Sequence, residues 1–206
     1  GDAGIAGPQI RDQDGKIRYE CARRFHTPLG QFFGYTGLEK RFPRNALCGR
    51  YLMTAWDHND TREVEAITGA CMLVRRRLLQ DIGPLFDESF FMYAEDADTC
   101  YRARKAGWKV YFVATARIIH YWNKSAGQAP LKMQVEMVKA VELFFKKNCG
   151  WGAVVTHRVL LVAAALGMLV LLPPAALMSS AEKRKKWDNI LARAKRIVAW
   201  GLNLAR

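Results

Sequence analysis

A run of 20 residues without a charged side chain, Val159 to Met178, most constrains what this chain can fold into. As one α-helix, the run would be about 30 Å long, which is roughly the thickness of a bilayer core. Apolar runs of this length usually meet lipid, although a buried core helix followed by a solvated helix is the alternative. The run is therefore a candidate membrane segment.

Two features argue against a simple transmembrane span. Pro173 and Pro174 interrupt the run, and basic residues flank it on both sides, which would leave one basic cluster on the wrong side of a membrane. We expect instead a re-entrant or interfacial helix. Residues 182–206 carry eight Lys and Arg against two acids, with Trp187 and Trp200 as interface anchors. They are predicted to form a basic amphipathic helix on anionic headgroups.

The composition bounds the remaining possibilities. The chain has 32 Lys and Arg against 19 Asp and Glu, so its surface must attract anions, whether nucleic acid, anionic lipid or phosphorylated small molecules. The five cysteines lie 23 or more residues apart without a Cys-x-x-Cys or Cys/His cluster. This spacing indicates neither a zinc site nor a dense disulfide framework, and it fits a reducing cytoplasm.

The first 150 residues alternate patterns typical of strands and helices. We expect a strand over 3–10, a long basic connection over 25–51 with a short helix at 28–35, and a strand over 67–74. A short helix ending at Gly83 and Pro84 follows, then a helix from 95 to Gly107, one or two strands over 108–122, and an amphipathic helix over 131–147. The pattern predicts an α/β fold.

Three carboxylates, Glu95, Asp96 and Asp98, stand directly after the aromatic stretch Phe90–Tyr93 and before a basic segment. Acids are common in the first turn of a helix because they suit its dipole, so helix capping is one interpretation of each of them. The arrangement as a whole, with His120 following at the end of a strand, also suits a site that accepts a proton.

Residues 67–120 closely resemble the C-terminal half of the catalytic domain of GT-A family 2 glycosyltransferases, especially bacterial rhamnosyltransferase-like enzymes that build surface polysaccharides. The blocks "GACMLVRR", "FDESFFMYAEDADTCYR", "KAGWKV" and "ARIIH" match in order and spacing. The resemblance implies a partial GT-A domain over 1–150, its acceptor-side half, followed by a membrane-associated region over 151–206. The nucleotide-binding half would lie before Gly1, so this part alone is expected to bind donor poorly.

The resemblance also implies a site. Asp96 would be the general base of an inverting transfer, and Glu95 and Asp98 would orient neighbours, bind acceptor hydroxyls or cap the helix. His120 falls where many family members place a histidine at a metal, here Mg²⁺ or Mn²⁺, whose main ligands are expected in the nucleotide-binding half. A structural histidine is the alternative. We further expect Asp96 to point into an open cleft, facing His120.

Other residues are weaker candidates for substrate contacts. Thr68, Gly69 and Ala70 would line the sugar pocket, with tight sheet packing as the alternative. Tyr93 is assigned to the pocket and Phe90 to the core. The group Trp56, Asp57 and His58 is expected to contact the acceptor.

The expected partners are a nucleotide-sugar donor, a glycan or lipid-linked acceptor and an anionic membrane, at the cytoplasmic face of a bacterial inner membrane. Rhamnose is the sugar that the resemblance suggests. One rival is a basic nucleic-acid-binding module, but no RRM, KH, helix-turn-helix or zinc pattern occurs, so no nucleic acid is expected. The other rival is a noncatalytic membrane anchor in which the acids only cap a helix.

Overall fold

The computed structural model describes residues 1–121, 130–177 and 181–202. In chain order the elements are β1 (Ala3–Arg11), the 3₁₀ helix η1 (Tyr19–Cys21), β2 (Ala22–Arg23), α1 (Pro28–Thr36), α2 (Leu38–Arg41), β3 (Arg62–Val64), β4 (Ala66–Ile67), β5 (Leu73–Val74), α3 (Arg76–Ile82), α4 (Glu95–Lys105), β6 (Lys109–Ile119), α5 (Pro130–Asn148), α6 (Trp151–Leu177) and α7 (Ala181–Gly201). The predicted α/β class is confirmed.

The main sheet is mixed and has the strand order β3-β6-β1-β5. Its two long central strands, β1 and β6, run parallel, and the short edge strands β3 and β5 pair with them antiparallel. A second, two-stranded sheet joins β2 to β4. Parallel neighbours require a long crossover connection, and here that connection carries every element between β1 and β6.

One face of the main sheet packs on α4. Alternate residues of β6, namely Val110, Phe112 and Ala114, are buried, as the two-residue period of a strand requires when one face is covered. They meet Cys100 and Ala103, which lie one turn apart on α4. This packing fixes α4, and hence the acid cluster at its start, against the sheet.

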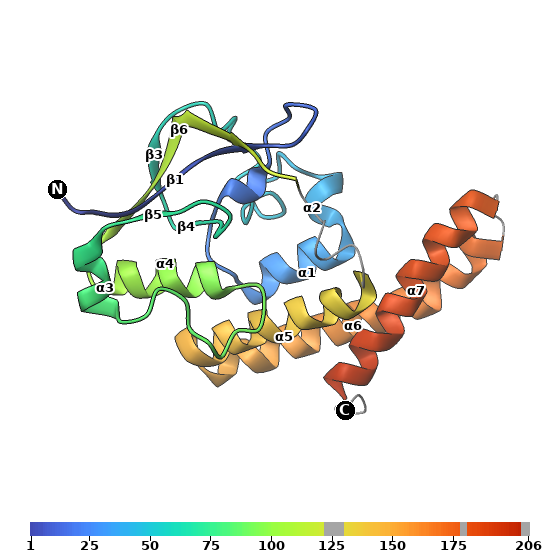
Figure 1. Ribbon diagram of the computed structural model, residues 1–206. Helices are drawn as coiled ribbons and strands as arrows, with labels where there is room; N and C mark the ends of the chain where they lie inside the picture. Colours follow the sequence, from blue (N-terminus) through green and yellow to red (C-terminus); the bar gives the residue numbers. More distant parts are fainter. Residues whose placement is uncertain (122–129, 178–180, 203–206) are drawn as a thin grey trace.

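Helices α5 and α6 lie on the other side of α4 from the sheet, as Figure 1 shows, and α1 and α7 join them in one helical layer by packing against α6. Helix α6 packs against α1, α5 and α7. The interior of this layer contains Tyr35 of α1, residues of α6 and residues of α7, including Trp200. Trp200 is thus buried rather than available as a lipid anchor, which corrects the prediction for that residue.

Two sequence predictions of local structure are wrong. The strand expected over 67–74 is divided into β4 and β5, because the intervening Gly69 gives its backbone N–H to the Asp96 carboxylate instead of a neighbouring strand. The proline pair does not interrupt the apolar helix, since α6 continues through Pro173 and Pro174 to Leu177. Met178 and residues 203–206 lie outside the described residues.

Candidate active site

The chain enters α4 through two consecutive residues in the left-handed region, Tyr93 (φ 71°) and Ala94 (φ 62°). This conformation is uncommon for residues other than glycine, so the surrounding packing must hold it. Ala94 is the N-cap, and no side chain caps the helix there. The acids occupy the first turn as predicted, and Asp96 accepts a hydrogen bond from the first-turn backbone N–H of Ala97.

Asp96 lies close beneath the surface, with 8% of the residue exposed. Its Oδ1 accepts hydrogen bonds from Arg23 Nη2 at 2.6 Å and from the Ala97 backbone N–H at 2.7 Å. Its Oδ2 accepts one from the Gly69 backbone N–H at 2.9 Å. Each donor comes from a different part of the chain, so the carboxylate joins β2 and the turn after β4 to the start of α4.

Opposing effects set the charges of Asp96 and Arg23. Burial by itself raises the pKa of Asp96, but the Arg23 guanidinium and the Gly69 N–H outweigh it, and the pKa is lowered overall. Burial likewise disfavours the charged form of Arg23, yet the adjacent carboxylate raises its pKa. Both groups are therefore ionised at neutral pH.

The expectation of an open cleft at Asp96 is wrong for the described residues. The larger of the two best-formed cavities, about 140 Å³, is lined by Arg24, Met53, Glu63, Val64, Glu65 and Arg104. The other, about 100 Å³, lies between the aromatic stretch 89–92 and α5. Neither is lined by Asp96, because the turn formed by residues 68–70 covers the carboxylate.

That covering turn brings together several of the predicted residues. Gly69 and Ala70 are exposed and Thr68 is half-buried. A Cβ added at Gly69 would lie 3.4 Å from the Asp96 Cβ and 3.6 Å from the Phe86 ring, so the backbone passes close to the acid. Residues 68–70 thus form a thin, exposed layer over Asp96.

Two further predicted residues, Tyr93 and Glu95, flank the start of α4 and are half-buried. Burial raises the pKa of Glu95, and the neighbouring Asp96 charge adds to this shift. Phe90 is buried, as predicted, while Phe91 is exposed.

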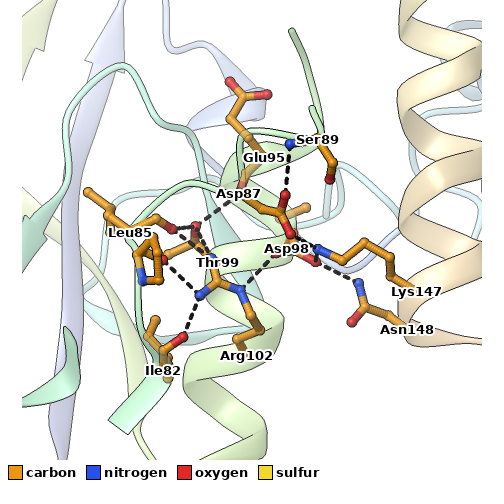
Figure 2. A network of polar contacts seen from close by, with 12 residues as sticks. Ile82, Leu85, Asp87, Ser89, Glu95, Asp98, Thr99, Arg102, Lys147 and Asn148 are labelled. Carbon is orange, nitrogen blue, oxygen red and sulfur yellow. Dashed lines mark hydrogen bonds and ion pairs between the residues drawn. The ribbon is translucent and has the colours of Figure 1, made fainter. Parts of the chain in front are cut away.

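Asp98 has a different environment from the one expected of a substrate ligand. It is fully buried and pairs with Arg102 Nε at 2.8 Å, Lys147 Nζ at 3.2 Å and Asn148 Nδ2 at 2.9 Å. Figure 2 shows this set, which we call the Asp98 network, between α4 and the end of α5. The geometry corrects the predicted acceptor contact and leaves Asp98 the role of orienting its neighbours.

The Asp98 network also holds the loop before the aromatic stretch. Arg102 donates to the carbonyl oxygens of Ile82, Pro84 and Leu85 at 2.7–3.0 Å, and Lys147 pairs with Asp87 (Figure 2). Three loop carbonyls are thereby satisfied by one guanidinium, which is oriented by a buried carboxylate. The loop that carries Phe86 toward Gly69 is consequently fixed to both helices.

The rings of Trp56 and His58 pack against the core of the main sheet. The Trp56 ring stacks on His58 with centroids 3.9 Å apart, and both rings meet Phe112 of β6 edge-on. His58 is fully buried and its Nδ1 and Nε2 lie near the backbone carbonyls of Trp56 and Ala22. Asp57 is exposed and accepts from the Asn59 N–H. His58 is therefore structural, which corrects the prediction for that residue, while the acceptor contact of the half-buried Trp56 stays a prediction.

His120 lies just beyond the end of β6, where its backbone N–H donates to the Arg11 carbonyl at 3.0 Å. No group of three or more His, Cys, Asp or Glu residues in the described ranges could hold a metal ion. The described residues by themselves therefore do not fit a Mg²⁺ or Mn²⁺ site, and His120 stays a single candidate ligand.

Residues on the far side of Asp96 were not predicted from the sequence. Arg23 and His26 are both buried. His26 Nδ1 is hydrogen-bonded to the Gln31 side-chain amide, and the His26 ring packs edge-on against Phe144. Burial lowers the pKa of His26 to about 3, so it is neutral near pH 7. The only sequence signal was a pair of adjacent arginines in an otherwise apolar stretch, which any surface strand could show.

Comparisons with known proteins agree with this architecture. Residues 47–138 match the model of the family described as "Glycosyltransferase like family 2". The chain is 34% identical over 158 residues to an N-acetylglucosaminyl-diphospho-decaprenol L-rhamnosyltransferase of Mycobacterium tuberculosis, a match that covers 72% of this chain and 48% of the relative.

A second relative is a low-salt glycan biosynthesis hexosyltransferase of Haloferax volcanii, 35% identical over 101 residues, or 49% of this chain and 27% of that protein. The chain thus spans about half the length, or less, of the curated relatives it matches. The family model and both relatives confirm the resemblance seen in the sequence. The chain belongs to the family 2 glycosyltransferases.

Proposed function

We propose that this chain forms the acceptor side of an inverting glycosyltransferase. The enzyme transfers a sugar, with rhamnose as the first candidate, from a nucleotide-sugar donor to a hydroxyl of a lipid-linked or surface-polysaccharide acceptor. The observation that carries the proposal is the ionised Asp96 carboxylate at the start of α4, close beneath the surface and in contact with the exposed turn 68–70. The names of the relatives, a rhamnosyltransferase and a hexosyltransferase, support the reaction class.

The reaction assigns one step to Asp96. An acceptor hydroxyl attacks the anomeric carbon from the face opposite the leaving diphosphate, and its proton passes to the carboxylate as the new C–O bond forms. A general base must come within hydrogen-bond reach of the proton that it removes. The exposed turn at Gly69 and Ala70 contacts the carboxylate through the Gly69 N–H, so a displacement of this turn would open the carboxylate to the acceptor.

Family 2 enzymes generally use a divalent metal ion, which would stabilise the charge of the leaving diphosphate. The described residues by themselves form no site for such an ion. His120 is proposed only as one imidazole ligand within a larger set.

The transfer itself is tested with the full-length protein and a panel of nucleotide-activated sugars, beginning with activated rhamnose. The acceptor is an N-acetylglucosaminyl-diphospho-polyprenol. We expect a single new glycosidic bond whose anomeric configuration, measured by NMR, is inverted relative to the donor. A product with retained configuration would contradict the use of one base in a single displacement.

We also propose that α6 lies along an anionic membrane surface. Within the described residues, one helix segment, Trp151–Leu171, is long and apolar enough to cross a membrane, with mean hydropathy 2.1 and 22% of its most apolar window buried. One face of α6 exposes an apolar stripe formed by Trp151, Val155, Val159, Leu166 and Val170. The stripe supports contact with lipid.

Packing on the other faces of α6 favours an interfacial helix over a spanning one. Helix α1 packs along α6, and Arg158 pairs with Glu142 of α5 at 2.6 Å. If α6 crossed a bilayer, these partners would have to enter hydrocarbon with it, at a high cost for their polar groups. A helix lying in the interface keeps them in water.

The double substitution Val159→Asp and Val170→Asp is expected to weaken binding to vesicles of equal parts phosphatidylcholine and phosphatidylglycerol at least about tenfold, because it removes apolar burial and adds negative charge. Flotation of this chain with the vesicles measures the loss of binding. The control, Gln13→Asp with Asn59→Asp, changes net charge equally at exposed positions away from α6. Equal losses in both variants would mean that charge alone drives the binding.

A further inference from the structure

Arg23 occupies an unusual position for a charged residue. It lies in the two-residue strand β2, opposite Ala66 of β4, with 8% of its side chain exposed. Its Nη2 donates to Asp96 Oδ1 at 2.6 Å and its Nη1 to the Glu20 carbonyl at 3.2 Å. Burying a guanidinium costs free energy unless it is paired, so the contact with Asp96 is what makes this position stable.

The two oxygens of the Asp96 carboxylate are not equivalent. Oδ1 accepts two hydrogen bonds, from Arg23 and from Ala97, whereas Oδ2 accepts one, from Gly69. A carboxylate oxygen has two lone pairs, so Oδ1 is fully used and Oδ2 keeps one free. The oxygen with the free lone pair is the one that contacts the exposed turn 68–70.

We infer that Arg23 is a positioning residue for Asp96. It binds Oδ1, so that Oδ2 is the atom left to accept a proton from the acceptor, and it keeps the buried carboxylate ionised. This inference rests on the proposed function, since it assigns the base to one atom of the proposed site. Arg23 itself is not assigned a contact with substrate.

Removing the Arg23 guanidinium is expected to raise the pKa of Asp96. Burial favours the neutral acid, and the remaining Gly69 and Ala97 N–H groups carry no full charge. The other titratable groups near the pair are His26 and Tyr51 from the segments flanking α1 and α2, and Glu95 and Cys100 on α4. While Arg23 is present none of these supplies a positive charge at neutral pH, because burial and the Arg23 charge both lower the pKa of His26.

The test compares Arg23→Gln with Arg23→Lys in the full-length protein. For Arg23→Gln, the acid limb of kcat/KM against pH is expected to move upward by about 1–3 pH units, the effect of one close opposite charge. Arg23→Lys keeps the charge and should leave the limb within about half a unit. Arg24→Gln is the matched control, since this neighbouring arginine is more exposed and pairs with Glu65. A lowered kcat/KM with an unmoved limb would show that Arg23 is merely structural.

A second measurement uses thermal unfolding of this chain and remains valid where Arg23→Gln is destabilised or inactive but still unfolds in a cooperative transition. An acid whose pKa is lowered by folding stabilises the folded protein, and this stability is lost as pH falls. An acid whose pKa is raised by folding destabilises the folded protein as pH rises. The deficit in Tm of Arg23→Gln relative to Arg24→Gln should therefore shrink from pH 7 to pH 4. A constant deficit would overturn the inference. If Asp96→Asn retained sugar transfer, the assignment of Asp96 as the base would be wrong. The effect of Arg23 on the Asp96 carboxylate could still be tested, because thermal unfolding does not depend on activity.

Discussion

Asp96→Asn is expected to lower kcat for sugar transfer by the full-length protein by about two to four orders of magnitude, the usual contribution of a positioned general base. The amide oxygen of asparagine can still accept from Arg23, whereas its Nδ2 replaces the oxygen that accepts from Gly69, so one of these two contacts keeps its acceptor. Asparagine cannot take a proton at neutral pH. Initial rates at saturating donor and acceptor measure the loss, and the acceptor KM should change little.

Glu95→Gln is the matched control for this variant. Glu95 is the adjacent acid in the same turn and is half-buried, but the Arg23 guanidinium donates to Asp96 and not to Glu95. A loss of less than about tenfold is expected there if Asp96 alone supplies the base. Unchanged transfer by Asp96→Asn would remove the base assignment and favour the noncatalytic anchor, in which the first-turn acids only stabilise α4.

Asp98→Ala is expected to cost about 3–5 kcal/mol of the free energy of unfolding, which is typical for breaking a buried ion pair. The substitution would leave Arg102 and Lys147 without their shared carboxylate and Asn148 without an acceptor. Urea or thermal unfolding of this chain, followed by far-ultraviolet circular dichroism, measures the effect.

Asp87→Ala distinguishes the contribution of the buried Asp98 carboxylate from that of the more exposed Asp87 carboxylate, which also pairs with Lys147. The Asp87 side chain is 36% exposed and the Asp98 side chain is fully buried, so loss of the Asp87 pair should cost no more than about 1 kcal/mol. If the two variants were equally unstable, the loop contacts of Asp87 and not the burial of Asp98 would govern the stability of the network.

Much of the fold around the site could be predicted because its signals are local. The helix α4 follows from acids in its first turn and basic residues in its last, and β6 follows from a long run of β-branched and aromatic residues. The ends of α1 and α5 lie within one residue of the predicted ends. These elements depend on neighbouring positions, which a single sequence displays directly.

The environment of Asp96 could not be predicted because it depends on contacts that are distant in sequence. Its partner Arg23 is 73 positions away and Gly69 is 27 positions away. An aspartate in the first turn of a helix looks the same in sequence whether it is open to solvent or covered by a turn. The same reason explains His58, whose burial depends on packing against β6.

The parallel pairing of β1 with β6 has a consequence for how the chain is made. Ala3 pairs with Lys109, so about a hundred residues must be synthesised after the start of β1 before β6, its central neighbour, can pair with it. At a synthesis rate of about 5–20 residues per second, that interval lasts roughly 5–20 s. During this time the apolar β1 edge stays unprotected against pairing with other chains, which makes the nascent protein most vulnerable to aggregation before β6 emerges.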